Sequence, residues 1–170
     1  FRINEAIMEA CEAEEAHRKL VTFFDRLFYE FDSKHAIDTY VLCLSEHLHD
    51  NDDGLLSMWR GYGAQGSGVA VVFDLSKLNS IEQSPLVIGK VEYASHPARL
   101  DWIDSKLLQV AELLKEHPKT DENLFSIAHA WIERLKLFAL FSKHIGFSEE
   151  NEWRVVYMSE RDPEGKLRSM

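Results

Sequence analysis

Residues 152–158, Glu-Trp-Arg-Val-Val-Tyr-Met, decide the fold, because they form the clearest strand pattern in the chain. β-Branched and aromatic side chains dominate the stretch, as is typical of strands. Side chains alternate between two faces along a strand, so Glu152 and Arg154 share one face while Val155 and Tyr157 take the other. We expect Val155 and Tyr157 to face a core, with the two charged residues opposite.

Three upstream segments have the composition of partner strands. Residues 39–45, Thr-Tyr-Val-Leu-Cys-Leu-Ser, predict a short buried strand. The uninterrupted apolar run of residues 69–73 predicts a strand that is buried on both faces. Residues 86–93 predict a further strand, opened by Ser84-Pro85. We expect all of these segments and residues 152–158 to form one central, mostly antiparallel sheet.

Apolar residues recur at helical spacing in three longer segments, residues 3–31, 102–114 and 124–141. Within the first segment, the polar residues 12–19 leave two alternatives, an exposed stretch of one long helix or a break between two helices. Together with the sheet, these segments predict an α+β fold in which long amphipathic helices flank a central sheet.

The bulk composition bounds the class of protein. The chain has 170 residues, 45% hydrophobic and 28% charged, which predicts a single domain over residues 1–170. It begins at Phe1 and ends just after a turn at residues 162–165, so we expect sequence to be missing at both ends. A formal net charge of −10 disfavours bulk nucleic acid as a partner. No apolar run suits a membrane span, and Cys11 and Cys43 are expected to be free thiols of a cytoplasmic protein.

The carboxylates Glu150 and Glu152, where the last strand begins, form the first candidate site. Such a pair can bind a ribose hydroxyl and stabilise a cationic centre. The alternative is a solvated strand face on which Arg154 pairs with its neighbours. Ser45, at the end of the first strand, is either a polar group at the rim of a cleft or the first residue of a turn. We predict that Glu152, Arg154 and Ser45 line one concave site with part of residues 59–62.

The motif Trp59-Arg60-Gly61-Tyr62-Gly63 is the second candidate. Aromatic rings beside an arginine can stack on a planar ring and hold a phosphate, so Trp59, Arg60 and Tyr62 are candidate ligand-binding residues, as is Arg154. The alternative is a core tryptophan, a surface arginine and glycines that only turn the chain. The glycines form neither a Walker loop nor a dinucleotide fingerprint. A short helix over residues 55–59, capped by Asp52 or Asp53, is expected to carry the motif.

The loop at residues 47–53 holds the densest set of possible metal ligands, His47, His49, Asp50, Asp52 and Asp53. The spacing fails the EF-hand pattern, because a glycine comes too early and the closing glutamate is absent. Helix capping and solvation account for these residues. We therefore predict that the loop binds no intrinsic metal.

Several short motifs, taken in order, resemble the bacterial family called domain of unknown function 2971. They are Leu44-Ser45-Glu46, residues 58–63, residues 68–74, Val91-Glu92-Tyr93, Lys143-His144-x-Gly146-Phe147 and Glu150-x-Glu152-Trp153-Arg154. The resemblance implies a bacterial, cytoplasmic protein of a kind often encoded among phage-defence or mobile-element genes. It implies no assured activity. The family's usual upstream asparagine-aspartate-proline stretch is absent.

A second similarity is to the arginine–serine–glutamate class of ADP-ribosyltransferases. Glu150-Asn151-Glu152 resembles that class's Glu-x-Glu motif, and Cys43-Leu44-Ser45 resembles its Ser-x-Ser strand with a cysteine in the first position. The class's strand arginine has no match, because Arg2 opens a helix.

This similarity implies roles for the candidate residues. Glu152 would orient the nicotinamide ribose of NAD and stabilise an oxocarbenium-like transition state, with support from Ser45. Glu150 would position or deprotonate the acceptor. Trp59 or Tyr62 would stack on nicotinamide.

Three functions stay open on the sequence. The first is a defence-associated, NAD-dependent ADP-ribosyltransferase with NAD as its substrate. The second is a non-catalytic sensor module that binds a small nucleotide or a partner segment in the same cleft. The third is hydrolytic chemistry at the His47 and His49 loop. The sequence specifies no other cofactor, and it fixes neither the acceptor nor the oligomeric state.

Overall fold

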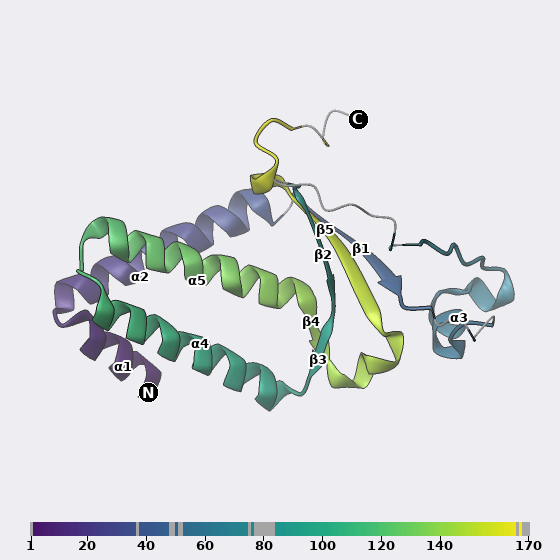
Figure 1. Cartoon of the computed structure of the whole chain (residues 1–170), viewed down its shortest axis with the longest axis horizontal. Coiled ribbons are helices and arrows are strands. Elements are labelled where there is room, and N and C mark those ends of the chain that lie inside the picture. Colours follow the sequence, from purple (N-terminus) through teal and green to yellow (C-terminus); the bar gives the residue numbers. More distant parts are fainter. Residues whose placement is uncertain are drawn as a thin grey trace. The chain divides into compact units, whose positions relative to one another are not determined.

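A computed structural model describes residues 2–36, 38–47, 50, 53–74, 76, 84–165 and 167 (Figure 1). The chain folds as two compact units, each made from two stretches of sequence. The helical unit comprises Phe1–Ile37 and Ala94–Ser142, and the sheet unit comprises Asp38–Tyr93 and Lys143–Met170. One unit is held together by helix packing and the other by strand pairing.

Four long helices build the helical unit. Helix α1 (Arg2–Cys11) packs on α4 (His96–Glu116), and α2 (Glu14–Glu30) packs on α5 (Asp121–Phe141). Their apolar faces enclose a core of Ala10, Cys11, Ala16, Leu20, Ala111, Leu114, Leu124 and Ala128. The prediction of long amphipathic helices is confirmed. Helices α4 and α5 begin a few residues before the predicted segments 102–114 and 124–141. No helix in the described part of the chain combines the length and apolar character needed to cross a membrane.

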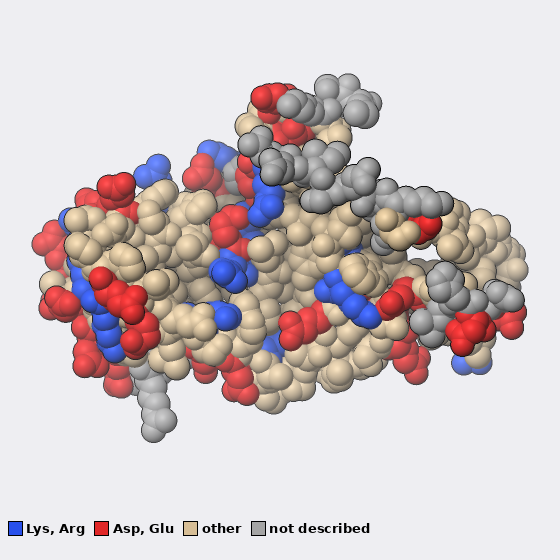
Figure 2. Space-filling model, viewed as in Figure 1, with Lys and Arg blue, Asp and Glu red and all other residues tan. Residues whose placement is uncertain are grey.

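Local sequence sets the ends of these helices. The hydroxyl of Ser95 accepts a hydrogen bond from the Ala98 amide, and that of Thr120 accepts one from the Asn123 amide, each at 3.3 Å. Glu12 has a left-handed backbone (φ 63°), which ends α1. Of the two alternatives for residues 3–31, the structure therefore has a break between two helices. Acidic side chains gather at the end of the helical unit where α1 is followed by α2 (Figure 2).

The sheet unit contains a three-stranded antiparallel sheet in the order β1-β5-β2. Strand β1 spans Thr39–Ser45, β2 spans Leu86–Lys90 and β5 spans Glu152–Met158. Strand β5 is central, so Leu42 of β1 and Ile88 of β2 both lie opposite its Val155. The predicted α+β class and the antiparallel pairing of these three segments are confirmed.

The predicted strand over residues 86–93 is divided in two. Val91 is buried, and its N–H donates to the carbonyl of Glu152 at 2.8 Å. Beyond this point β3 (Glu92–Ala94) pairs with β4 (Ser142–His144) in a separate two-stranded sheet. The three residues of β4 follow directly after α5 and have no strand pattern of their own.

Residues 69–73 form no strand, so that prediction is wrong. Within the described part of the chain the segment belongs to no sheet and has no regular structure. Its side chains are exposed, with Val69 at 89% and Phe73 at 60%. Strand propensity measures how well a residue fits a half-buried pleated surface, and it needs a partner strand to act. Both flanks of β5 are already taken by β1 and β2.

Two predictions of burial are also wrong. Strand β1 is an edge strand whose residues are mostly exposed. Of the two residues predicted to face the core, Tyr157 is buried but Val155 is only half-buried. Val156 and Met158, on the same face as Glu152, are fully buried. Alternation identifies the two faces of a strand, but it does not say which of them is covered.

The predicted short helix is α3 (Leu56–Tyr62), and it has no side-chain cap. Asp53 instead uses its backbone carbonyl, which accepts a hydrogen bond from the Trp59 indole at 2.7 Å, while Asp52 lies outside the described residues. Gly63 ends the helix, and a Cβ there would lie 2.4 Å from the Trp59 carbonyl oxygen. Helix α3 contacts the 3-10 helix Ile145–Glu150 of the same unit.

Candidate functional site

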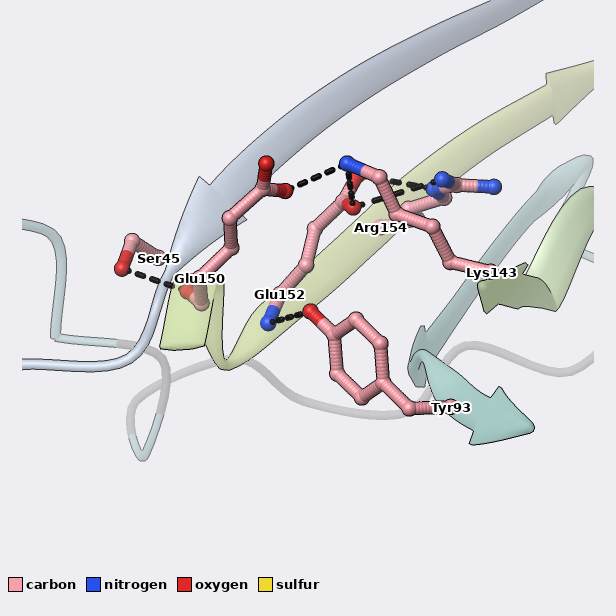
Figure 3. A network of polar contacts seen from close by, with 6 residues as sticks. All are labelled: Ser45, Tyr93, Lys143, Glu150, Glu152 and Arg154. Atoms are coloured by element: carbon pink, nitrogen blue, oxygen red, sulfur yellow. Dashed lines mark hydrogen bonds and ion pairs between the residues drawn. The ribbon is translucent and has the colours of Figure 1, made fainter. Parts of the chain in front are cut away.

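The start of β5 carries a buried carboxylate that is paired with two cations. Glu152 is only 4% exposed. Its Oε1 accepts a hydrogen bond from Nε of Arg154 at 2.8 Å. Its Oε2 accepts from Nη2 of Arg154 at 3.3 Å and from Nζ of Lys143 at 3.1 Å. Both carboxylate oxygens are therefore bound by cations of the same chain (Figure 3).

Glu150 joins this arrangement through Lys143, whose Nζ also forms an ion pair with the Glu150 carboxylate. The hydroxyl of Ser45 donates to the backbone carbonyl of Glu150 at 2.7 Å, and the N–H of Glu152 donates to the Tyr93 hydroxyl at 2.9 Å. Figure 3 shows these side chains converging. We call Ser45, Tyr93, Lys143, Glu150, Glu152 and Arg154 the charge network. Its two carboxylates and two cations cancel in formal charge.

A sharp turn at Asn151 brings the two glutamates to the same lysine. Asn151 has a left-handed backbone (φ 47°), a conformation that asparagine tolerates better than most residues. It turns the chain from the 3-10 helix Ile145–Glu150 into β5. The carbonyl of Asn151 accepts from the N–H of Glu46 at 3.0 Å, which fixes the turn against the end of β1. The Glu-Asn-Glu sequence thus acts as a local clamp around Lys143.

Hydrogen bonding outweighs burial in setting the charge states of the network. Burial alone would raise the pKa of Glu152, but hydrogen bonds from Arg154, Cys43 and Lys143 lower that pKa to about 2. Burial would likewise lower the pKa of Lys143, whereas its bonds to Glu150 and Glu152 raise it. The Glu152 carboxylate also raises the pKa of Arg154. Both cations and Glu152 therefore stay ionised at neutral pH.

The ionisation of Glu152 limits the chemistry it can perform. A carboxylate with a pKa near 2 is too weak a base for proton transfer at neutral pH. It can supply a fixed negative charge or accept a hydrogen bond. Because Arg154 and Lys143 already occupy both of its oxygens, a substrate would have to compete with them.

Four of the seven predicted site residues lie together. Ser45, Glu150, Glu152 and Arg154 belong to the charge network, although Ser45 contacts the backbone of Glu150 and not the side chain of Glu152. The other three, Trp59, Arg60 and Tyr62, are exposed residues of α3. That Glu152, Arg154 and Ser45 line one concave site with part of residues 59–62 stays a prediction.

Lys143 and Tyr93 are the network members that are not among the seven predicted site residues. Lys143 follows the apolar run of α5 and looks like an ordinary basic residue at a helix end. Tyr93 looks like a strand residue. The signal that could have found Lys143 is charge balance, because a partly buried carboxylate pair needs more than one cation and Arg154 is the only other one nearby in the sequence. Charge balance gives no signal for Tyr93, which is uncharged.

No group of three or more histidine, cysteine, aspartate or glutamate side chains suitable for a metal occurs among the described residues. His49 and Asp52 of the candidate loop lie outside those residues. That the loop binds no intrinsic metal therefore stays a prediction.

The fold and the network define an α+β protein with a partly buried charge network at one end of its main sheet. Residues 58–155 match the model of the family described as a protein of unknown function (DUF2971), and the chain belongs to that family. The matched region contains most of α3, Tyr93, Lys143 and the first four residues of β5. No curated protein and no solved structure gives a match. The similarity to ADP-ribosyltransferases has no support from these comparisons.

Proposed function

We propose that the sheet unit is a non-catalytic module that binds a small nucleotide through α3. Trp59 and Tyr62 are three residues apart, so they lie on one side of the helix. The Trp59 ring is fixed by its hydrogen bond to the Asp53 carbonyl, while Tyr62 is 72% exposed. The two rings offer stacking to a base, and the exposed guanidinium of Arg60 offers charge to a phosphate.

One observation carries the proposal: the aromatic and cationic side chains of α3 are exposed, while the network satisfies its charges internally. A catalytic carboxylate has to meet its substrate. Both oxygens of Glu152 instead bind Arg154 and Lys143. This division favours ligand binding on α3 and a supporting role for the network.

The proposal is tested by calorimetric titration of the full chain with ADP-ribose and with NAD. We expect binding that weakens about tenfold or more in Tyr62→Ala and in Arg60→Ala. Tyr29→Ala is a matched control, because Tyr29 of the helical unit is also 72% exposed. Absence of binding by the wild type, or an equal loss in Tyr29→Ala, would contradict the proposal.

A second candidate is the NAD-dependent transferase, which is favoured by one observation. Glu152 carries a fixed negative charge, and such a charge is what an oxocarbenium-like transition state requires. The assay is nicotinamide release from NAD by the wild type and by Glu150→Gln. Glu152→Gln is a poor probe, since it also leaves Arg154 and Lys143 without a charged partner. Release by the wild type that is lost in Glu150→Gln would favour the transferase over the non-catalytic module.

A further inference from the structure

Three of the four glycines at the end of α3 and in the turn that follows it have a structural reason to be glycine. A Cβ at Gly63 would lie 2.4 Å from the carbonyl oxygen of Trp59, and one at Gly68 would lie 2.8 Å from the Cα of Gly63. Gly66 has a positive φ of 93°, which favours glycine. Gly61 has neither restriction. It is an exposed, helical residue of α3, and no described atom lies within 4 Å of a Cβ placed there.

The glycine at position 61 has a cost for the helix. A glycine inside a helix weakens it, because glycine loses more conformational freedom on folding than any other residue. Alanine could adopt the same backbone at Gly61 without a clash among the described residues. What glycine provides at this position is a helix backbone that no side chain covers. Glycine serves in this way where a ligand has to approach the backbone closely.

The uncovered backbone lies on the side of α3 that faces away from Trp59. Successive helix residues are about 100° apart around the axis, so Gly61 lies between Arg60 and Tyr62 and about 160° from Trp59. The Trp59 ring packs against the chain itself. Its indole nitrogen donates to a backbone carbonyl, and a Cβ at Gly54 would lie 3.4 Å from that nitrogen. A ligand that contacts both Arg60 and Tyr62 therefore has its path over Gly61, where no described atom stands in the way.

We propose that the sugar of the bound nucleotide lies against the backbone of Gly61, between a base on Tyr62 and a phosphate at Arg60. This inference rests on the proposed function and names the residue that lets one ligand reach both side chains. A nucleotide joins base, sugar and phosphate in the same order in which α3 presents Tyr62, Gly61 and Arg60. A side chain at position 61 would hold the sugar away from the helix. Gly61 is therefore a specificity-determining residue for ligands that carry all three groups.

The test is calorimetric titration of the full chain with ADP-ribose, together with thermal unfolding of each variant. We expect the affinity to fall about tenfold or more in Gly61→Leu and by a smaller factor in Gly61→Ala. Gly61→Ala should at the same time raise the midpoint of thermal unfolding by about 1–4 °C, because alanine favours the helix. A merely structural glycine would not give a loss of binding together with a gain in stability.

Ser57→Ala is the matched control. Ser57 is an exposed residue of the same helix, and alanine there also favours the helix but adds no heavy atom. We expect the affinity of this variant for ADP-ribose to equal that of the wild type. An equal loss in Ser57→Ala would overturn the proposal, because it would assign the effect to a stiffer helix.

Three further outcomes would overturn the proposal. Wild-type affinity in Gly61→Leu would show that the sugar does not lie on Gly61, and it would leave the proposed function in place. A lower unfolding midpoint in Gly61→Ala would mean that the chain itself packs against this position. Absence of ADP-ribose binding by the wild type would reject the proposed function, and this inference with it.

Discussion

The two units bury their apolar side chains to different extents. In the helical unit, small and large side chains from four helices form one buried cluster, with Leu114 and Leu124 almost fully enclosed. In the sheet unit, few apolar residues are buried, chiefly Val91 and the end of β5. Strand β1 and residues 69–73 leave their apolar side chains largely exposed.

The difference indicates where each unit obtains its stability. The helical unit relies on burial of apolar surface, which is the usual source of stability in a domain. The sheet unit has less of that contribution and adds a partly buried, internally compensated charge network. A compensated network is sensitive to the loss of either partner, since an unpaired buried charge costs much more than the intact pair contributes. The two units should therefore tolerate different substitutions.

The largest effect is expected from Glu152→Gln. Loss of the carboxylate charge leaves Arg154 and Lys143 in a partly buried site without their shared partner, and we expect a loss of about 3–5 kcal/mol in unfolding free energy. Glu46→Gln is the matched control, because the Glu46–Lys90 pair belongs to the same unit but is exposed. It should change stability by about 1 kcal/mol or less. Denaturant titration of both variants measures the difference, and equal effects would show that burial of the network adds nothing.

Leu124→Ala tests the helical core. Leu124 is fully buried, and its truncation should cost about 2–5 kcal/mol through lost burial and the cavity left behind. Leu56→Ala makes the same change at an exposed position of α3 and should alter stability by about 0.5 kcal/mol or less. Thermal and denaturant unfolding of the two variants provide the measurement. A similar cost at both sites would remove the distinction between the units.

A smaller effect is expected at the helix caps. Thr120→Ala removes the hydroxyl that accepts from the Asn123 amide and should cost about 1 kcal/mol. The substitution should also raise hydrogen exchange in the first turn of α5 while leaving β5 unchanged. Thr120→Ser, which keeps a hydroxyl, is the control and should restore most of the lost stability. Equal loss in the serine variant would assign the effect to packing of the threonine methyl.

Much of the fold can be predicted from local sequence patterns, namely helical periodicity and strand composition. The helical periodicity of residues 102–114 and 124–141 and the strand composition of residues 39–45 and 152–158 give elements where we expect them. The polar residues 12–19 are compatible with a helix break or with an exposed stretch of one helix, and the structure has the break. Residues 69–73 fail because strand formation needs a partner, and the choice of partner depends on the whole chain.

The charge network is only partly predictable from the sequence, because the partners of its carboxylates also depend on the fold of the whole chain. Glu150 and Glu152 stand out because carboxylates at the entrance of an otherwise apolar strand need a partner or a function. Arg154 lies two residues away on the same strand face and can be inferred to pair with them. Lys143 reaches them only through β4, which has no sequence pattern, so its place in the network appears only in three dimensions.

Arg154 and Lys143 hold Glu152 as a carboxylate that is ionised at neutral pH, and the titration of Glu152 tests this most directly. A carboxyl group whose pKa is lowered by folding contributes stability above its ordinary pKa of 4.5, and that contribution is lost as the pH falls toward 2. Carbon-detected NMR of the side-chain carboxyl, assigned by comparison with Glu152→Gln, reports the pKa in the folded protein. We expect a value of about 2, with a stability loss over the same range of pH. A pKa near 4.5 would contradict the account, because it would mean that Glu152 is not held by the two cations.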